Sequence, residues 1–253
     1  MRDIRGMSVL VTGGGSGIGE GVARYYVERG ARVTICGRRA EKVAAVSHEL
    51  GESCFGVQAD VTSDQDRQRL VKAAVEHGGG LDALVSNAGN MYRGPLAALE
   101  ADKVLELFNT NVVAGMMLTQ LAVSHLAARQ GAVIFLGSVH TRRAFPGASP
   151  YAATKAALES VTRVFAAELG SEGVRVNCVV PGAVPTEINQ RAGLVDDETA
   201  RARLDAMASI HALGRIGTAD EIAEAIDYLV RGEWTTGAVL DVDGGLGLGL
   251  TDT

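Results

Sequence analysis

The feature that most constrains the fold of this sequence is an alternation of short apolar runs with longer segments of helical period. The apolar runs are rich in β-branched residues, as is typical of strands that are buried on both faces of a sheet. The alternation predicts an α/β fold, a doubly wound parallel sheet with helices on both faces. The predicted strands occupy residues 8–11, 32–36, 54–58, 83–86, 132–136, 175–179 and 238–242.

We expect residues 1–253 to form a single domain. Its length and its 47% hydrophobic content are enough for one sizeable core. The sequence contains no change of composition, no internal repeat and no low-complexity segment. The predicted helices occupy residues 17–29, 40–50, 64–77, 101–129, 151–170 and 219–231.

Two segments depart from this regular alternation. Residues 103–129 are apolar almost all round from Leu107 onward, whereas a helix that covers one sheet needs only one apolar stripe. We therefore expect a second subunit against this helix, the alternative being a core helix under a long loop. Residues 183–215 show no strand pattern, and so long an excursion indicates a lid or a substrate-binding loop.

Composition excludes several classes of function. A formal net charge of −6 leaves no basic surface for nucleic acid or membranes. Cys36, Cys54 and Cys178 are an odd number of thiols inside apolar runs, which favours free cysteines in a reducing compartment. The first residues lack the apolar stretch of a secretory signal, so we expect a cytoplasmic protein. No His, Cys and acid cluster has metal-ligand spacing, and no metal site is predicted.

The first predicted strand runs into the sequence TGGGSGIG, residues 12–19. Its glycines follow the pattern T-G-x-x-x-G-x-G rather than the standard G-x-G-x-x-G. Missing side chains at Gly13, Gly17 and Gly19 allow a tight turn, in which backbone N–H groups can approach a pyrophosphate at a helix N-terminus. With Thr12 and Ile18 in the same turn, this segment predicts a nucleotide site.

Two arginines follow the second predicted strand. In an NAD site, an acid about 20 residues after the glycine turn accepts hydrogen bonds from the ribose hydroxyls. Gly37 occupies that position here, and Arg38 and Arg39 follow it. Because a guanidinium can hold a 2′-phosphate, the arrangement favours NADP over NAD. The alternative is a solvated basic turn, although cations oppose the dipole of a helix N-terminus unless an anion lies nearby.

Small and polar residues follow the third and fourth predicted strands. Asp60 and Val61 come after the third strand, and Asn87, Ala88 and Gly89 after the fourth. Ligands bind at the carboxyl ends of parallel strands, so these residues are expected on the cofactor's side of the sheet. Asp60 could accept a hydrogen bond from an adenine amino group, or it could cap the next helix.

The densest group of candidate catalytic residues is Ser138, Tyr151 and Lys155. Tyr151 and Lys155 are spaced i, i+4 on one helix face, which brings the ammonium beside the phenol. A free phenol is a poor acid–base group at neutral pH, and a neighbouring cation favours its ionised form. Ser138 would then hydrogen-bond the substrate oxygen. A Tyr and a Lys at this spacing could also be two exposed residues on a helix surface. Ser138, 13 positions earlier at the end of a strand, makes the catalytic interpretation more specific.

Other polar residues have two interpretations each. Asn111, inside the apolar helix, is either a satisfied core amide or a member of a proton relay that reaches Lys155 through water. His140 and Met91–Tyr92 could line a substrate pocket, or have structural roles.

Together these residues closely resemble the short-chain dehydrogenase/reductase family, over essentially the whole chain. The tail sequence GAVLDVDGG is also similar to the family's last strand. The matches are Thr12, Gly13, Gly17 and Gly19 with its cofactor turn, Asp60 with its adenine contact, Asn87-Ala88-Gly89 with its N-A-G element, Asn111, Ser138, Tyr151 and Lys155 with its catalytic tetrad, Pro181-Gly182 with its loop after the sixth strand, and Thr186 with a threonine near the nicotinamide carboxamide.

The resemblance implies a seven-stranded Rossmann-like sheet, in a homotetramer built on the helices expected at 103–129 and 151–170. It also implies hydride transfer between a nicotinamide and a carbonyl or alcohol carbon. Tyr151 would donate the proton in the reductive direction, and Ser138 would polarise the carbonyl. Lys155, next to Tyr151 at the cofactor, would hold the nicotinamide ribose.

Within the family, the segment LGRIGTADEIAEAIDYLV is similar to the 3-oxoacyl carrier-protein reductases. Those enzymes carry two basic residues for an acidic carrier. Arg129 matches one, but Glu172 stands at the other, which argues against a carrier-protein role. We therefore expect an NADP(H)-dependent oxidoreductase acting on a small-molecule ketone or secondary alcohol. The alternatives are an NAD-dependent alcohol dehydrogenase of the same fold and a nucleotide-sensing protein without turnover.

Overall fold

The computed structural model describes residues 1–188, 202, 204 and 206–249. Within these residues the strands form one parallel sheet of seven strands in the order β3-β2-β1-β4-β5-β6-β7. The expected α/β fold is thereby confirmed. The strands are β1 (Ser8–Thr12), β2 (Arg32–Gly37), β3 (Cys54–Gln58), β4 (Ala83–Ser86), β5 (Ala132–Leu136), β6 (Arg175–Pro181) and β7 (Val239–Val242).

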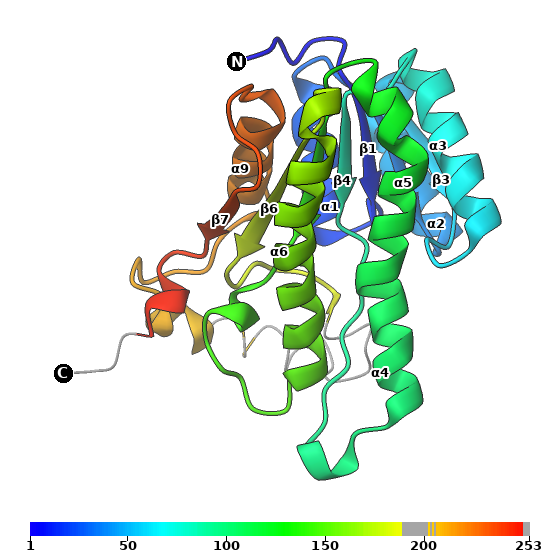
Figure 1. Cartoon of the computed structure of the whole chain (residues 1–253). Coiled ribbons are helices and arrows are strands. Elements are labelled where there is room, and N and C mark those ends of the chain that lie inside the picture. Colours follow the sequence, from blue (N-terminus) through cyan, green and yellow to red (C-terminus); the bar gives the residue numbers. More distant parts are fainter. Residues whose placement is uncertain (189–201, 203, 205, 250–253) are drawn as a thin grey trace.

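Helices cover both faces of the sheet, and each face has its own hydrophobic core. The pleat of β1 separates them, because Val9 and Val11 belong to one core and Leu10 to the other. Figure 1 shows α5 and α6 side by side in front of the sheet. One layer holds α1 (Gly17–Glu28), α2 (Ala40–Leu50) and α9 (Ala219–Arg231), and the other α3 (Asp64–Gly78), α5 (Ala114–Ala127) and α6 (Ser149–Leu169). The short helix α4 (Ala101–Phe108) precedes α5, and its Leu107 packs with Tyr151 of α6.

The strand order determines where a ligand can bind. The sheet grows from β1 toward β2 and β3 on one side, and toward β4 and the later strands on the other. The connections after β1 and β4 therefore run in opposite directions and leave a crevice at the carboxyl ends of the strands. This crevice is the position in which we expected the nucleotide.

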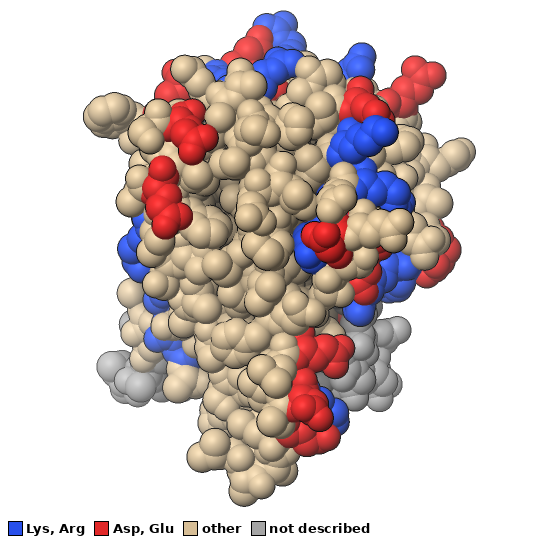
Figure 2. Space-filling view, turned by 45° about the vertical axis from the view of Figure 1, so that its right-hand side comes forward, with Lys and Arg blue, Asp and Glu red and all other residues tan. Residues whose placement is uncertain are grey.

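The helix expected at 101–129 is interrupted. A π-helical turn, η3 (Asn109–Val113), separates α4 from α5. Leu105 is 67% exposed and Val113 44% exposed, so part of the apolar surface of this helix faces outward. Figure 2 shows a broad face around α5 whose charged side chains gather toward its edges. No helix within the described residues is long and apolar enough to span a membrane.

The end of α9 depends on a buried arginine of β6. The guanidinium of Arg175 donates hydrogen bonds to the carbonyl oxygens of Leu229, Val230 and Gly232 at 2.6, 2.6 and 2.8 Å. These carbonyls lie at the last turn of α9, where no intrahelical donor remains. One side chain thus joins the start of β6 to the helix that covers it.

We predict that Arg175→Met destabilises the protein by roughly 2 to 4 kcal/mol, because it leaves buried carbonyls without donors. In a chain of this length the melting temperature should fall by about 4 to 16 °C, as measured by circular dichroism. Arg32→Met is the matched control, since Arg32 also begins a strand but is exposed. An equal loss in both variants would contradict this role of Arg175.

Candidate active site

A cavity of about 240 Å³ opens at the carboxyl ends of the strands. It gathers residues from the turns after β1, β2, β3, β4, β5 and β6. The residues expected from the sequence that line it are Gly13, Gly17, Ile18, Arg38, Asp60, Val61, Asn87, Ala88, Gly89, Ser138, Tyr151, Lys155, Pro181, Gly182 and Thr186. Four expected residues do not line it: Thr12, Gly19, Arg39 and Asn111.

The glycine turn is built by close packing. Gly13 has a φ of +68°, a conformation that favours glycine. A Cβ on Gly19 would lie 2.4 Å from the Gly13 carbonyl oxygen and 2.5 Å from Asn87 Nδ2. Gly19 therefore lets the first turn of α1 pack directly on the loop, so that its N-terminus faces the cavity.

Thr12 supports the cavity wall from behind. Its hydroxyl oxygen accepts hydrogen bonds from the backbone N–H groups of Asn87 and Ala88, at 3.0 and 2.9 Å. The side-chain amide of Asn87 returns a hydrogen bond of 2.8 Å to the Thr12 carbonyl. The ends of β1 and β4 are thus held together across the crevice.

Asp60 lines the cavity and does not cap the next helix. The cap of α3 is Ser63, whose hydroxyl accepts a hydrogen bond from the N–H of Asp66. Oδ1 of Asp60 accepts hydrogen bonds from the backbone and the hydroxyl of Thr62, at 2.9 and 2.7 Å. Its second oxygen has no hydrogen bond from the described residues, and can accept one from a ligand.

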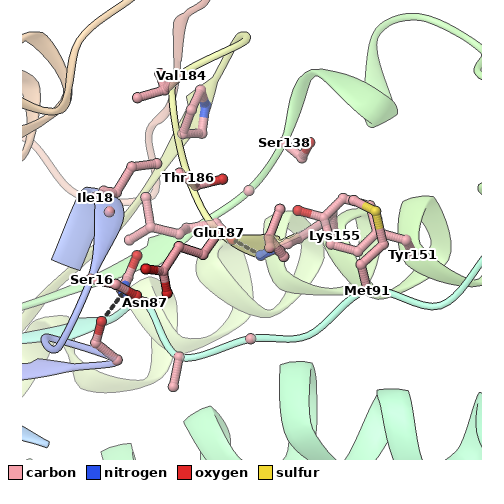
Figure 3. Close-up of a pocket in the computed structure, with 18 of the residues that line it drawn as sticks. Ser16, Ile18, Asn87, Met91, Ser138, Tyr151, Lys155, Val184, Thr186 and Glu187 are labelled. Carbon is pink, nitrogen blue, oxygen red and sulfur yellow. Dashed lines mark hydrogen bonds between the residues drawn. The ribbon is translucent and has the colours of Figure 1, made fainter. Parts of the chain in front are cut away.

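Tyr151 and Lys155 come together on α6, and both are buried at the cavity (Figure 3). Lys155 Nζ lies 5.5 Å from the centre of the Tyr151 ring and donates a hydrogen bond of 2.7 Å to the Leu136 carbonyl. This anchor at the end of β5 fixes the ammonium beside the phenol. It uses one of three N–H donors, so others remain for a ligand.

Ser138 is held by a histidine two residues later. Its Oγ lies 3.0 Å from His140 Nδ1 and accepts a hydrogen bond of 3.3 Å from the His140 backbone N–H. The imidazole packs against Phe145 and, edge to face, against Tyr151 at 5.1 Å. Burial, assisted by the nearby Arg93 and Lys155, lowers the pKa of His140 to about 4. The ring is therefore neutral at pH 7.

Of the other residues with two interpretations, Met91 lines the cavity and Tyr92 does not. The Tyr92 hydroxyl instead accepts a hydrogen bond of 3.1 Å from the Glu100 N–H. Asn111 is a satisfied amide within the π-helical turn: it exchanges two hydrogen bonds with the Asn90 backbone and donates a third to Thr154. Its part in a proton relay stays a prediction.

The two arginines after β2 have different surroundings. Arg38 lines the cavity, and its guanidinium has no hydrogen bond or ion pair with any described residue. Arg39 does not line the cavity, but it donates to two residues that do, Glu187 at 2.7 Å and Ser16 at 3.1 Å. Burial raises the pKa of Glu187, but hydrogen bonds from Arg39 and Lys42 outweigh it and hold that pKa below its usual range.

Part of the expected substrate loop at 183–215 contributes to the cavity. Residues 189–201, 203 and 205 lie outside the described residues. Several lining residues of this segment were not expected from the sequence, because they belong to no motif and so carry no local signal. They are Ala183, Val184, Glu187, Ile188, Leu204 and Met207.

Comparison with known proteins gives concordant matches. A family model described as Enoyl-(Acyl carrier protein) reductase matches residues 13–247. The L-fucose dehydrogenase of Bos taurus is 37% identical over 249 residues, covering 96% of this chain and 90% of that protein. The glucose 1-dehydrogenase of Gluconobacter oxydans (strain 621H) is 34% identical over 251 residues, covering 96% and 92%.

One solved structure extends the likeness to the fold. It is a short-chain dehydrogenase/reductase of unknown function from Caenorhabditis elegans, crystallised with its cofactor. Its TM-score is 0.91 at 28% sequence identity, and the match covers 98% of both chains.

The buried imidazole should make stability depend on pH. The pKa of His140 is about 4 in the folded protein and near 6.5 in an unfolded chain. The unfolded state therefore binds more protons between these values, and folding is opposed progressively as the pH falls from about 6.5 toward 4. We predict that urea denaturation of His140→Gln shows a smaller loss of unfolding free energy between pH 7 and 4.5, by about 2 kcal/mol.

The same group can be titrated directly by NMR of the imidazole protons. A midpoint below pH 5 is expected in the native protein. A midpoint at 6.5 or above would show that the ring is charged more easily than its burial implies.

Proposed function

The chain belongs to the short-chain dehydrogenase/reductase family of oxidoreductases, and we propose that it transfers hydride between NADP(H) and a carbonyl or secondary alcohol. The observation that carries this proposal is the position of Ser138, Tyr151 and Lys155 in one cavity with the glycine turn. A protein that only senses a nucleotide does not need those three groups together.

The residues present fit a nicotinamide dinucleotide. A Cβ at Gly13 would lie 2.9 Å from Asn87 Nδ2, and one at Gly89 would lie 3.3 Å from Asn111 Oδ1, so this wall of the cavity is formed by backbone. Asp60 offers an acceptor suited to an adenine amino group, and the N-terminus of α1 suits a pyrophosphate. When bound, the dinucleotide supplies or accepts the hydride.

The proton chemistry belongs to the protein. In reduction, the Tyr151 hydroxyl gives its proton to the oxygen of the carbonyl, and the Ser138 hydroxyl holds that oxygen by a hydrogen bond. The Lys155 ammonium, held at the Leu136 carbonyl, favours the phenolate that Tyr151 becomes. In oxidation the same phenolate takes the proton from the alcohol.

The proposal of NADP rests on the end of β2. Gly37 and Arg38 line the cavity where an NAD site has its acid, and Arg38 has no protein partner among the described residues. An unpaired guanidinium at this position suits a 2′-phosphate.

A second candidate is alcohol oxidation with NAD. It is favoured by Glu187, whose carboxylate pairs with Arg39 at 2.7 Å and would repel a second anion beside the basic turn. The names of two relatives, L-fucose dehydrogenase and glucose 1-dehydrogenase, also support oxidation of an alcohol.

We further propose a homotetramer in a reducing, cytoplasmic compartment. Leu105, Val113 and, on α6, the 52% exposed Val164 present apolar surface that a second subunit could cover. Cys36, Cys54 and Cys178 are free and buried, and burial raises their pKa values to about 12, 11 and 12. Such thiols are typical of a reducing environment.

Tyr151→Phe should lower turnover by at least a hundredfold, because it removes the proton that the carbonyl oxygen must receive. Its dissociation constant for the cofactor, measured by fluorescence titration, should change less than threefold. The exposed Tyr228 provides the control Tyr228→Phe, for which both quantities should remain unchanged. Retention of turnover within tenfold in Tyr151→Phe would refute the proposed mechanism.

Separate titrations with NADPH and NADH test the cofactor. We expect NADPH to bind at least ten times more tightly, and Arg38→Ala to remove this preference. Glu187→Gln should strengthen NADPH binding, because Arg39 then loses its competing carboxylate. Arg32→Ala is the control for a general effect of charge. Equal or tighter binding of NADH would instead support the second candidate.

A further inference from the structure

Two arginines near the catalytic residues have no anionic partner among the residues that the structure describes. Arg93 lies on the segment after the N-A-G element, and Arg143 lies on the loop after β5. Nε of Arg93 and Nη1 of Arg143 are buried nitrogens that no described residue hydrogen-bonds. Neither guanidinium forms an ion pair within the described part of the chain.

The two segments that carry these arginines are joined beside the catalytic residues. The Gly94 N–H donates a hydrogen bond of 2.9 Å to the Gly147 carbonyl. Met91, two residues before Arg93, packs against Tyr151. The charge of Arg93 is also close enough to His140 to help lower the pKa of that imidazole. Arg93 is therefore near the ring that contacts both Ser138 and Tyr151.

Several carboxylates near these two segments are bound by other cations. Arg142 pairs with Glu159 and with Asp241, each at 2.9 Å. On the other segment, Glu100 is engaged by Lys103 at 2.7 Å. Glu159, Asp241 and Glu100 are therefore engaged by other cations and form no ion pair with Arg93 or Arg143.

A buried guanidinium nitrogen without a partner is costly, because it has lost its water and gained no hydrogen bond. The planar fork of an arginine matches the two oxygens of a carboxylate. His140, neutral at pH 7, offers a further polar group without adding a second buried charge. His140 lines the cavity together with Ser138 and Tyr151, and the charge of Arg93 lies close to this imidazole.

We propose that Arg93, assisted by Arg143 and His140, binds a carboxylate of the substrate, which is a short oxo acid or the corresponding hydroxy acid. This inference rests on the proposed function, since Ser138 and Tyr151 define where the carbonyl lies. In reduction the carbonyl carbon gains the hydride of NADPH and its oxygen gains the proton of Tyr151. The carboxylate keeps its charge, and NADP⁺ and the hydroxy acid leave.

The test compares acids with their neutral methyl esters. Pyruvate, acetoacetate and levulinate place the carboxylate at increasing distance from the carbonyl, and each ester replaces the charge by one methyl group. The native enzyme should prefer at least one acid to its ester by tenfold or more in kcat/KM. Arg93→Gln should lower kcat/KM for that acid by about 10 to 100-fold and reduce the preference over the ester to less than threefold.

Two variants serve as references. Arg93→Lys keeps the charge without the fork and should retain part of the preference. Arg29→Gln removes an exposed arginine at the far end of α1 and should leave the preference intact. If acids and esters are reduced equally well by the native enzyme, or if Arg93→Gln behaves like Arg29→Gln, the carboxylate site is refuted while the oxidoreductase function stands.

A binding measurement separates this site from turnover. Acetoacetate with NADP⁺ cannot be reduced, so its effect on the melting temperature reports binding alone. We expect acetoacetate to raise the melting temperature of the native protein more than methyl acetoacetate does, and Arg93→Gln to abolish the difference. This result would uphold the carboxylate site even if no carbonyl were turned over. The absence of any difference in the native protein would overturn it.

Discussion

The cavity depends on the hydrogen bonds that hold the ends of β1 and β4 together. These strands are neighbours in the sheet, but the connection after β1 leads toward β2 and the connection after β4 leads toward β5. A crevice therefore remains between the two connecting loops. The Thr12 hydroxyl accepts hydrogen bonds from two backbone N–H groups of the N-A-G element, and the side-chain amide of Asn87 donates one to the Thr12 carbonyl. Behind the wall these groups bond to one another, so that Gly13 and Gly89 line this part of the cavity with backbone only.

The catalytic side chains are positioned by a similar arrangement, in which each polar group is bound to protein on one side. Lys155 is anchored at the Leu136 carbonyl, and Ser138 is anchored by His140. Each keeps capacity for a further hydrogen bond that no described residue uses. Groups held in this way lose little freedom when a substrate binds, which is what efficient proton transfer between fixed partners requires.

The sequence predicted what depends on local pattern and missed what depends on distant pairing. The strand runs and the glycine turn have signals within a few residues, and the fold that they imply is confirmed. The π-helical turn at Asn109–Val113 has no such signal, so one helix was expected where two lie. Arg39 pairs with Glu187, 148 positions away, and no local pattern could predict that contact. Arg38 and Arg39 therefore have different surroundings, although they were expected to act together.

Within the described residues, a chain with a formal net charge of −6 places one unpaired cation, Arg38, at the cavity and another, Arg93, near the catalytic residues, and this contrast bears on its function. Arg38 lies at one end and Arg93 near the catalytic residues, while most other arginines of the described chain have carboxylate or carbonyl partners. An unpaired cation in a concave, partly dry site attracts anions more strongly than one on an open surface, because field lines are focused there. On the proposals made above, Arg38 favours a cofactor with a 2′-phosphate, and Arg93 favours a substrate that is itself an anion. The carboxylate of Glu187 neutralises Arg39, so that Arg39 attracts anions less than Arg38 and Arg93 do.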